Sequence, residues 1–332
     1  MKLLTVFVCV IFVLTCPQDA REIPQEVLVL LSGTSPSTVA VVNSIGFECD
    51  VEIPEIPQPY GSPGRRGMSA GYWNRSLIAC GGLDNSGPPI SSFKDCQMLD
   101  LDTRMWQEGP DMPELLAYSG YTMVGSVFYV IGGYHTKYDG GGPTQYVYSD
   151  QIYFLDLADI EIGWVTLDMK LPSASSDLCA VASPKGNIFV IGSLSGYFNP
   201  NQADSWTSIP NQEGVGLGCD LYLTEFNSSI VVAVGGSSLK NKVETLNIGS
   251  EDLPDMAWNT DLPPFSEERT RRPSIGVLNL DLIIAGGSQT SSKIEKFTEF
   301  GWSQDASGAL KETRADQASI RVPSSMFPEC QS

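Results

Sequence analysis

The sequence predicts an all-β fold in which six four-stranded sheets, or blades, form a ring called a β-propeller. One observation is a phrase that recurs along the chain, an apolar strand that ends in a glycine pair. Its clearest copies end at Gly81-Gly82, Gly132-Gly133, Gly235-Gly236 and Gly286-Gly287. A second observation is the spacing of the copies, about fifty residues, which is typical of short strands repeated around a propeller. Together these observations predict the architecture but not the ligand.

Two further copies complete the count of units. Gly192-Ser193 has serine in place of the second glycine, and Ser32-Gly33 is a weaker copy near the start. Six units predict six blades, and five or seven remain possible if a degenerate unit is misassigned. A ring of repeats suits a chain of 332 residues, because each unit buries its faces only against its neighbours.

Each unit is predicted to hold four strands. Two apolar strands joined by a polar or glycine turn precede the pair, as in residues 68–82 and 119–133. A third strand of alternating apolar and polar residues follows, as in residues 95–102, 151–159 and 243–249. These strands end in residues that favour turns. Carboxylates at this place could suggest calcium, but their recurrence at one turn of the repeat favours a turn role for Asp100, Asp102, Asp156 and Asp159.

A tryptophan opens the fourth strand in five units, and a proline follows it in most. The indole supplies a large apolar plate for packing between sheets, and proline is tolerated at a strand edge or exit. We therefore assign the tryptophans to the core rather than to ligand stacking, and expect Phe47 to take this place in the first unit. The residues concerned are Trp106, Trp164, Trp206, Trp258 and Trp302, with Pro113, Pro172, Pro210 and Pro263.

The glycine-pair phrase followed by a spaced tryptophan resembles the kelch repeat, and the resemblance covers residues 27–327. It implies a β-propeller with one repeat per blade. The unit at Gly192 departs from the pattern, since only 14 residues separate Gly192 from Trp206, so its third strand is expected to be short. Kelch propellers commonly serve as binding platforms. Intracellular relatives carry adaptor domains or bind actin, roles that fit badly with an export signal.

Closure of the ring is predicted from the two ends of the chain. Residues 316–327 look like an innermost strand without a partner, and the first unit has three strands without an innermost one. Joining them puts N- and C-terminal strands in one blade and hides two sheet edges. Residues 21–332 would then form a single propeller domain.

Residues 1–20 are predicted to be a secretory signal peptide, because Lys2 precedes an apolar run, residues 3–14, that is short for a membrane span. A membrane anchor is the alternative. The mature chain is expected to be secreted, with no membrane insertion. The formal net charge of −19 makes nucleic acid a poor partner. The single histidine excludes a copper site like that of galactose oxidase and a histidine-rich zinc site, and we expect no cofactor and no metal.

Six cysteines follow the predicted signal peptide, and an even number in an exported chain indicates disulfides. Cys80 and Cys96 are predicted to be neighbours on adjacent strands. Cys49 and Cys330 fall in the closing blade, where a bond would clasp the ring. Cys179 and Cys219 fall on innermost strands of consecutive blades, so they would bridge near the axis or remain free thiols.

Two glycosylation sequons suggest which face is free. Asn74 and Asn227 both fall at the first hairpin turn of their units, so glycans there would crowd one face. We call the other face the open face; it is formed by the loops that follow the second and fourth strands. Its ligand candidates are Arg65, Arg66, Tyr134, His135, Tyr138, Arg271, Arg272 and Arg314.

These candidates suggest a site for an acidic ligand or peptide, since arginine binds carboxylates and tyrosine offers rigid contact area. Alternatively, the arginines only neutralise nearby carboxylates, and Tyr146 and Tyr148 only pack their own strand. The leading hypothesis is a secreted, non-catalytic module that binds an unknown extracellular protein or matrix component. A structural matrix component is one alternative. A sialidase-like glycosidase with an arginine-held carboxylate and a tyrosine nucleophile is another, although the chain has no Asp-box turn.

Overall fold

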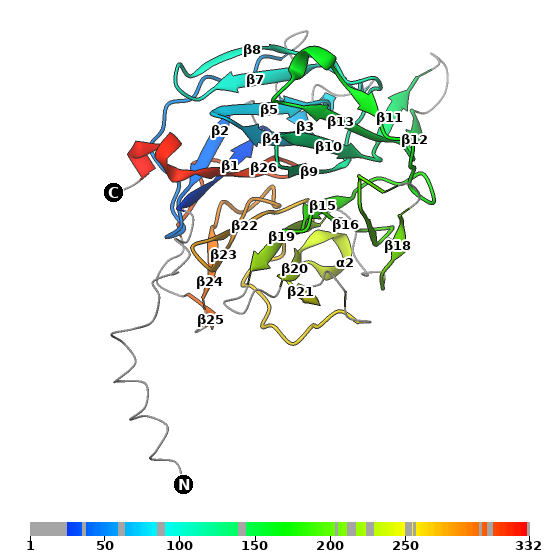
Figure 1. Cartoon of the computed structure of the whole chain (residues 1–332). Helices are drawn as coiled ribbons and strands as arrows, with labels where there is room; N and C mark the ends of the chain where they lie inside the picture. The colour runs from blue at the N-terminus through cyan, green and yellow to red at the C-terminus, as the bar shows by residue number, and fades with distance from the viewer. Residues whose placement is uncertain are drawn as a thin grey trace, which may run out of the picture.

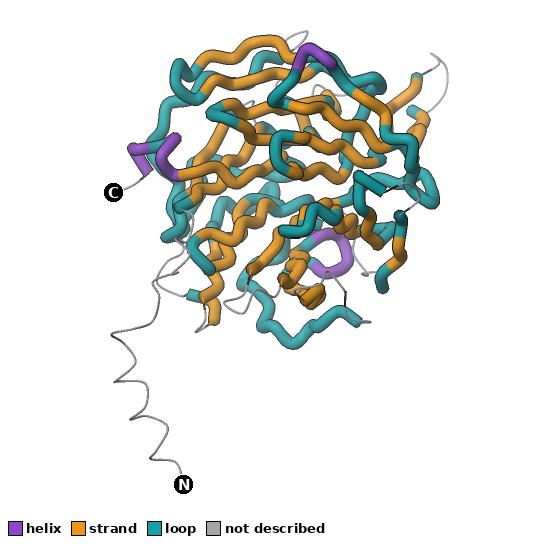
Figure 2. The backbone as a smooth tube through the Cα atoms, viewed as in Figure 1, coloured by secondary structure: helices purple, strands orange, loops and turns teal. Residues whose placement is uncertain are grey.

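The structure is a computed structural model that describes residues 25–34, 38–58, 64–84, 90–138, 144–202, 205–210, 217–223, 229–249, 254, 257–298, 301–303 and 308–330. Six sheets surround a common centre in these residues, and strands far outweigh helices (Figure 1, Figure 2). The predicted all-β propeller of six blades is therefore confirmed. The predicted signal peptide lies outside the described residues.

The first three blades follow the order expected of the repeat, from the innermost strand outwards. Blade 1 has three strands in the described residues rather than the predicted four: β26 (Ala318–Pro323), β1 (Glu26–Leu31) and β2 (Val39–Val42), with only an isolated bridge from Val42 to Glu48 beyond them. Blade 2 consists of β4 (Ser69–Trp73), β5 (Ser76–Cys80), β7 (Cys96–Asp100) and β8 (Met105–Gly109). Blade 3 consists of β9 (Gly120–Val124), β10 (Val127–Ile131), β13 (Ile152–Asp156) and β14 (Val165–Thr166).

The other three blades complete the ring. Blade 4 consists of β15 (Cys179–Ala182), β16 (Ile188–Ile191), β17 (Gly196–Phe198) and β18 (Thr207–Ser208), so its third strand is short, as predicted. Blade 5 consists of β19 (Gly218–Leu223), β20 (Ser229–Val234) and β21 (Val243–Gly249), with Asn259 bridged to Thr245 in place of a fourth strand. Blade 6 consists of β22 (Ser274–Leu278), β23 (Asp281–Ala285), β24 (Glu295–Thr298) and β25 (Gly301–Trp302).

In the part of the chain that the structure describes, two small two-stranded sheets and four short helical segments lie outside these blades. β3 (Arg65–Arg66) pairs with β6 (Leu83–Asp84), and β11 (Tyr134–Lys137) pairs with β12 (Gln145–Tyr148). The helical segments are α2 (Gly236–Leu239) and the 3-10 turns η2 (Ile160–Ile162), η3 (Ser324–Met326) and η4 (Pro328–Cys330). Of the helices in the described residues, none is long and apolar enough to cross a membrane.

The ring is closed by pairing of the two chain ends. β26 pairs antiparallel with β1, from Glu26↔Pro323 to Leu31↔Ala318, and the two strands lie side by side in Figure 1 (red and blue). Each innermost strand contacts the next one round the axis, and β22 of blade 6 contacts β26 of blade 1. The predicted closing blade is therefore confirmed.

Apolar side chains form one core layer between each pair of neighbouring blades. Between blades 1 and 2, for example, Val29 and Leu31 pack with Ala70 and Leu77, and all four are buried. Full burial of such a valine or leucine side chain is worth about 1.5–3 kcal/mol. Stability is therefore distributed round the ring rather than held in one central core.

The glycine pairs are required where a blade meets the connection to the next blade. Gly132 has φ +59°, and a Cβ there would lie 2.6 Å from the carbonyl oxygen of Ser175, which belongs to the connection into blade 4. Gly133 has φ +103° and is equally crowded, by Ser119 and Ala117. A side chain at these positions would both strain the backbone and push the neighbouring blade away.

Four of the five repeated tryptophans form a hydrogen bond to a proline that follows the preceding blade. The indole N–H donates to the proline carbonyl oxygen, over 2.9 Å from Trp106 to Pro54 and 2.8 Å from Trp164 to Pro110. Trp206 is the exception, because it donates to Ser208 of its own blade. The predicted core role is confirmed, and the same contact recurs for Trp258 with Pro210 and for Trp302 with Pro263. Phe47 does not take this place, since it is 45% exposed beside a turn.

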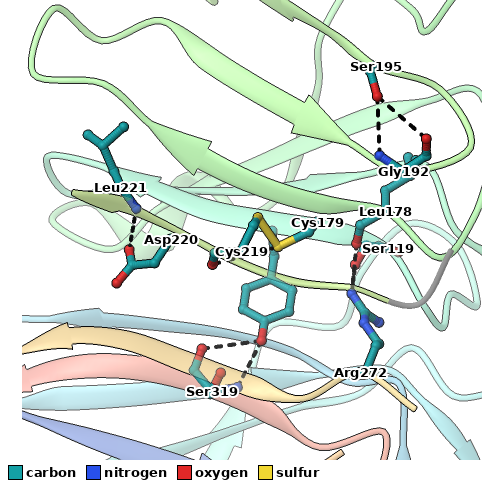
Figure 3. Close-up of a disulfide and its surroundings, with 11 residues drawn as sticks. Ser119, Leu178, Cys179, Gly192, Ser195, Cys219, Asp220, Leu221, Arg272 and Ser319 are labelled. Carbon is teal, nitrogen blue, oxygen red and sulfur yellow. Dashed lines mark hydrogen bonds between the residues drawn. A yellow bond between two sulfur atoms is a disulfide. The ribbon is translucent and has the colours of Figure 1, made fainter. Parts of the chain in front are cut away.

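All three disulfides pair as the repeat register predicts. Cys80 joins Cys96 across adjacent strands of blade 2. Cys49 joins Cys330, which ties the outer part of blade 1 to the segment after its innermost strand. Cys179 joins Cys219 between the innermost strands of blades 4 and 5 (Figure 3).

The repeated aspartates form turns, as predicted. A carboxylate oxygen of Asp100 accepts hydrogen bonds from the backbone N–H groups of Asp102 and Thr103, at 2.9 and 2.8 Å. Asp156 accepts in the same way from Ala158 at 3.0 Å. In the described residues, no group of three or more histidine, cysteine, aspartate or glutamate side chains is arranged to hold a metal ion.

Candidate functional site

A run of four backbone hydrogen bonds links the segments that enter five of the blades at the channel mouth on the open face. The N–H of Tyr118 donates to Gly67, and the N–H of Asp177 donates to Tyr118, both over 2.8 Å. On the other side, the N–H of Gly67 donates to Asp316, and that of Asp316 donates to Arg271. Each of these bonds links the entry segments of neighbouring blades. We call the linked residues, Arg271, Asp316, Gly67, Tyr118 and Asp177, the rim of the mouth.

The rim residues hold an unusual backbone conformation. Tyr118, Asp177 and Asp316 have φ values of +57°, +55° and +57°, and Gly67 has +68°. A non-glycine residue in this left-handed region costs about 1–2 kcal/mol. The backbone hydrogen bonds between neighbouring entry segments offset that cost.

Four tyrosines pack together beside the rim. The hairpin of β11 and β12, which we call the tyrosine hairpin, projects from blade 3 at the right of Figure 1. Tyr134 stacks on Tyr118 with ring centroids 5.5 Å apart. Tyr146 meets Tyr134 edge-on at 5.2 Å, and Tyr148 lies 5.9 Å from it. Such pairs contribute about 0.5–1.5 kcal/mol each beyond their buried area, so the exposed tyrosines rest on a base formed by the half-buried Tyr134 and the buried Tyr118.

The tyrosines of this base remain protonated. Burial is the main cause that raises the pKa of the Tyr118 phenol, and the carboxylate of Asp316 raises it further while Arg66 opposes the shift. Burial also raises the pKa of Tyr134, followed by the effect of Asp177. The phenols therefore act as neutral rings and hydrogen-bonding hydroxyls rather than as phenolates.

Three of the predicted arginines lie at this mouth, and they differ in burial and in hydrogen-bonding partners. Arg66 is half-buried and forms no ion pair among the described residues. Arg271 forms an ion pair with the buried Asp316. Arg272 is buried; it donates to the carbonyl oxygens of Ser119 and Leu178 at 2.7 and 2.8 Å. Because Arg272 comes from blade 6 and its acceptors from blades 3 and 4, its guanidinium spans the channel (Figure 3).

Arg272 also shapes the electrostatics of the rim. Its guanidinium carbon lies 5.6 Å from the ring centroid of Tyr118, a cation–π contact. Burial raises the pKa of the Asp177 carboxyl, and Arg272 opposes that shift. The guanidinium of Arg272 is therefore occupied by contacts within the protein. Arg66 and the partly exposed Arg271 are the arginines of the mouth that face solvent.

Arg65 and Arg314 do not belong to the ligand face, because they are 0% and 3% exposed. Arg65 donates to the carbonyl oxygen of Gly81 at 3.3 Å and forms an ion pair with Asp95. Arg314 donates to the carbonyl oxygen of Ser32 at 3.4 Å. Each acceptor is the first residue of the small-residue pair in the arginine's own blade. The proposed ligand role for these two arginines is thus replaced by a structural one.

Arg269 is a third member of this set that the sequence analysis missed. It donates to the carbonyl oxygen of Gly286 at 2.5 Å and forms an ion pair with Glu295 at 3.1 Å. Arg65, Arg269 and Arg314 each precede their innermost strand by four or five residues. That shared spacing was the available signal, since a repeated arginine in register indicates a repeated structural contact.

The remaining candidates lie as follows. His135 is half-buried on β11, where it pairs with Val147. Tyr138 follows β11 and is 52% exposed. Asn74 is exposed at the two-residue turn between β4 and β5, on the face opposite the mouth. Asn227 lies outside the described residues.

The central channel holds a cavity of about 290 Å³, lined by the innermost strands. Side chains cross it or join strands round it. The hydroxyl of Tyr121 in blade 3 bonds the backbone of Ser319 in blade 1, and Arg321 forms ion pairs with Glu26 and Asp220 at 3.1 and 3.2 Å. These contacts brace the innermost strands against one another across the channel.

Comparisons with known proteins support the fold alone. No family model matches the chain, and no curated protein matches it. The chain is similar to the solved structure of YjhT, a propeller, with 14% sequence identity and a TM-score of 0.57; the match covers 80% of this chain and 88% of that one. At this identity the likeness shows the propeller and says nothing of the ligand, so membership of the kelch family stays a prediction.

Proposed function

We propose that this protein is a secreted, non-catalytic binding module that contacts an extracellular protein or matrix component through the tyrosine hairpin of its open face. One observation carries the proposal. Tyr146 and Tyr148 are 49% and 52% exposed, yet both pack on the half-buried Tyr134, which itself stacks on the buried Tyr118. Rigid tyrosines offer large contact area at low conformational-entropy cost, as they do in antibody binding loops.

The state of the mouth residues favours binding over glycoside hydrolysis. A sialidase-like reaction would need a tyrosine that becomes a nucleophile and arginines free to hold a carboxylate. Burial raises the pKa of both Tyr118 and Tyr134, and Arg271 and Arg272 are engaged with Asp316 and with backbone carbonyl oxygens. The mouth is therefore better suited to recognition than to covalent catalysis.

Export is supported by the cysteines. Three disulfides in one chain are typical of proteins from oxidising compartments. One of them, between Cys49 and Cys330, clasps the closing blade, where the ring depends on strand pairing between distant segments. The predicted signal peptide points to the same compartment.

Capture experiments with matched surface variants test the proposal. The native chain and a Tyr146→Ser/Tyr148→Ser variant are immobilised and exposed to extracellular fluid or matrix extract, and bound proteins are quantified. The control is Met105→Ser/Ile162→Ser, which changes two side chains that are 67% and 66% exposed, one at the start of β8 and one at the end of η2. We expect the tyrosine variant to lose the captured partner and the control to keep it.

Two results would contradict the proposal. Equal capture by all three proteins would show that the tyrosine hairpin is not the contact surface. Turnover of a glycoside panel by the purified native chain, abolished in the tyrosine variant, would assign the surface to an enzyme instead.

A further inference from the structure

We infer that the tyrosine hairpin binds its partner by β-strand addition, in which an extended segment of the partner protein pairs with the free edge of β12. This inference rests on the proposed function, since it specifies how the same surface makes contact. It concerns the backbone of Gln145–Tyr148 rather than the tyrosine rings alone.

The hydrogen bonds of β11 establish which backbone groups face the free edge. The N–H and C=O of Tyr134 both bond Ala117, at 2.9 and 2.8 Å, on the side away from β12. Tyr134 lies opposite Tyr148, so these two residues form a pair that is not hydrogen-bonded within the hairpin. The bond from Ser149 N–H to Gly133, 2.9 Å, flanks the pair as this geometry requires.

It follows that the backbone N–H and C=O groups of alternate β12 residues point to the free edge of the hairpin. Val147, opposite His135, directs its N–H and C=O towards β11, whereas Tyr146 and Tyr148 direct theirs away from it. Neither Tyr146 nor Tyr148 forms a backbone hydrogen bond to another described segment. The free edge of β12 therefore presents two N–H and two C=O groups.

The two edges of the hairpin differ in whether other segments form hydrogen bonds to them. The edge of β11 is occupied, because Tyr134 bonds Ala117 and the N–H of Thr136 donates to the Ser92 hydroxyl at 2.8 Å. Among the described residues, no strand pairs with the outer edge of β12, and all four residues of the strand are exposed. Uncovered backbone groups on an exposed strand are a template for another strand.

β12 also lacks the features that protect sheet edges. Edge strands are commonly shielded by charged side chains, by proline or by a bulge. Gln145–Tyr148 has no charge, no proline and a regular four-residue register with β11. The outer strand β8, by contrast, carries Glu108 and is followed at once by Pro110.

The tyrosine rings would add selectivity to backbone pairing. Tyr146 and Tyr148 share one face of the hairpin with Tyr134, and Val147 lies on the other face with His135. Alternate residues of an added strand would therefore meet a tyrosine face. Aromatic and β-branched side chains are the best cross-strand partners for it.

The charge of the chain defines the kind of segment that fits. β12 carries no charge, and the whole chain has a formal net charge of −19. Two copies of so acidic a chain repel one another, whereas an uncharged or basic segment meets no such barrier. The occupant is therefore an extended, uncharged or basic segment of a different protein, rich in aromatic or β-branched residues.

A pair of substitutions at one position separates backbone from side-chain recognition. Tyr146→Pro removes an edge N–H without removing a bond to β11, and Tyr146→Val removes the phenol ring but keeps the N–H. The probe is a linear heptapeptide library displayed on phage and selected on the native chain. We expect the selected peptides to bind Tyr146→Pro at least about tenfold more weakly and Tyr146→Val within about threefold of the native chain.

Hydrogen exchange gives a readout independent of affinity and confirms that the hairpin of Tyr146→Pro is intact. In the native chain the amides of Tyr146 and Tyr148 should exchange fast and become protected when a selected peptide binds. The Val147 amide should be protected throughout, and its protection in the free Tyr146→Pro variant shows that the hairpin has formed. N-methylation of the peptide at the alternate residues whose N–H groups pair with β12 should abolish binding. N-methylation at the residues between them should leave binding unchanged.

Several outcomes would overturn strand addition. One is an equal loss of peptide affinity in Tyr146→Pro and Tyr146→Val. A second is hydrogen exchange at the amides of Tyr146 and Tyr148 that does not change when a peptide binds. A third is failure of the library to yield any peptide. A dimer of the native chain that Tyr146→Pro dissolves would assign the edge to a second copy and overturn the proposed occupant. Equal losses together with partner loss in Tyr146→Ser/Tyr148→Ser would leave the proposed function standing, with ring contacts as its basis.

Discussion

Tyr121 and Ser319 are joined across the channel by two hydrogen bonds through one hydroxyl group. The phenol accepts from the Ser319 N–H at 2.8 Å and donates to its carbonyl oxygen at 3.2 Å. Tyr121 belongs to β9 in blade 3 and Ser319 to β26 in blade 1. The contact therefore passes blade 2 and ties the closing strand to a blade it does not adjoin.

The Tyr121→Phe variant tests the contribution of this contact to stability. Removing the hydroxyl leaves the N–H and C=O of Ser319 without their partner, so the free energy of unfolding should fall by about 1–3 kcal/mol. Urea denaturation measures the change. Tyr138→Phe, which removes a hydroxyl from an exposed ring, is the control and should leave stability within about 0.5 kcal/mol of the native value. Equal stability of the two variants would contradict the bracing role.

Two glycines in blade 3 separate backbone strain from crowding. Gly132 and Gly125 have nearly the same φ, +59° and +60°, but a Cβ at Gly132 would lie 2.6 Å from Ser175 O, while nothing lies within 4 Å of one at Gly125. Gly125→Ala should cost about 1–2 kcal/mol for the left-handed backbone. Gly132→Ala should cost clearly more, because the connection into blade 4 must also move. Similar losses in thermal or urea unfolding would show that crowding does not explain the glycine pairs.

Asp177 makes the stability of the mouth dependent on pH. Burial raises the pKa of its carboxyl above the usual 3.8. At a pH between 3.8 and the raised pKa, the folded state therefore holds a proton on Asp177 that the unfolded state has released. Stability should therefore fall as the pH rises from about 3.8 through the raised pKa of the folded state. In the Asp177→Asn variant this loss should be absent.

The measurement is the unfolding free energy of both proteins between pH 3 and pH 8. The Asn variant should gain relative to the native chain as the pH rises, and the difference should level off above the raised pKa. Asparagine also tolerates the left-handed backbone at this position, where φ is +55°. A pH-independent difference would contradict a raised pKa at Asp177.

Asn74 is expected to carry a glycan when the chain passes through a eukaryotic secretory pathway. It is exposed at a tight turn, with Ser76 at the third position of the sequon. Enzymatic deglycosylation should lower the apparent mass, and Asn74→Gln should remove one step of that change. Binding through the open face should not change, because the turn lies on the opposite face. Loss of partner capture in Asn74→Gln with folding intact would contradict the assignment of faces.

The elements that repeat in register were predictable from the sequence. The blades follow from the glycine-pair phrase, and the disulfides of Cys80 with Cys96 and Cys49 with Cys330 follow from where each cysteine falls within a unit. Local rules sufficed here because each unit reproduces the same strand order and the same turns. The tryptophan positions were predictable for the same reason, although their proline acceptors in the preceding blade were not considered.

The contacts between distant units could not be predicted in this way. Arg65 and Arg314 were placed on the ligand face because they precede innermost strands, but their carbonyl acceptors lie inside the blade. The channel contacts of Tyr121 and Arg272 join residues more than ninety positions apart, and no local pattern marks them. The free edge of β12 could not be found from the sequence, because it follows from the pairing of β12 with β11 on its other side.

The clasp between Cys49 and Cys330 has a consequence for proteolysis. The two cysteines are 281 residues apart, so nearly the whole propeller lies within one covalent loop. A single cut in any exposed connection of that loop opens the backbone but releases no fragment, since both pieces stay attached through sulfur. A nicked molecule would therefore keep its full mass on a non-reducing gel and fall apart only after thiol treatment.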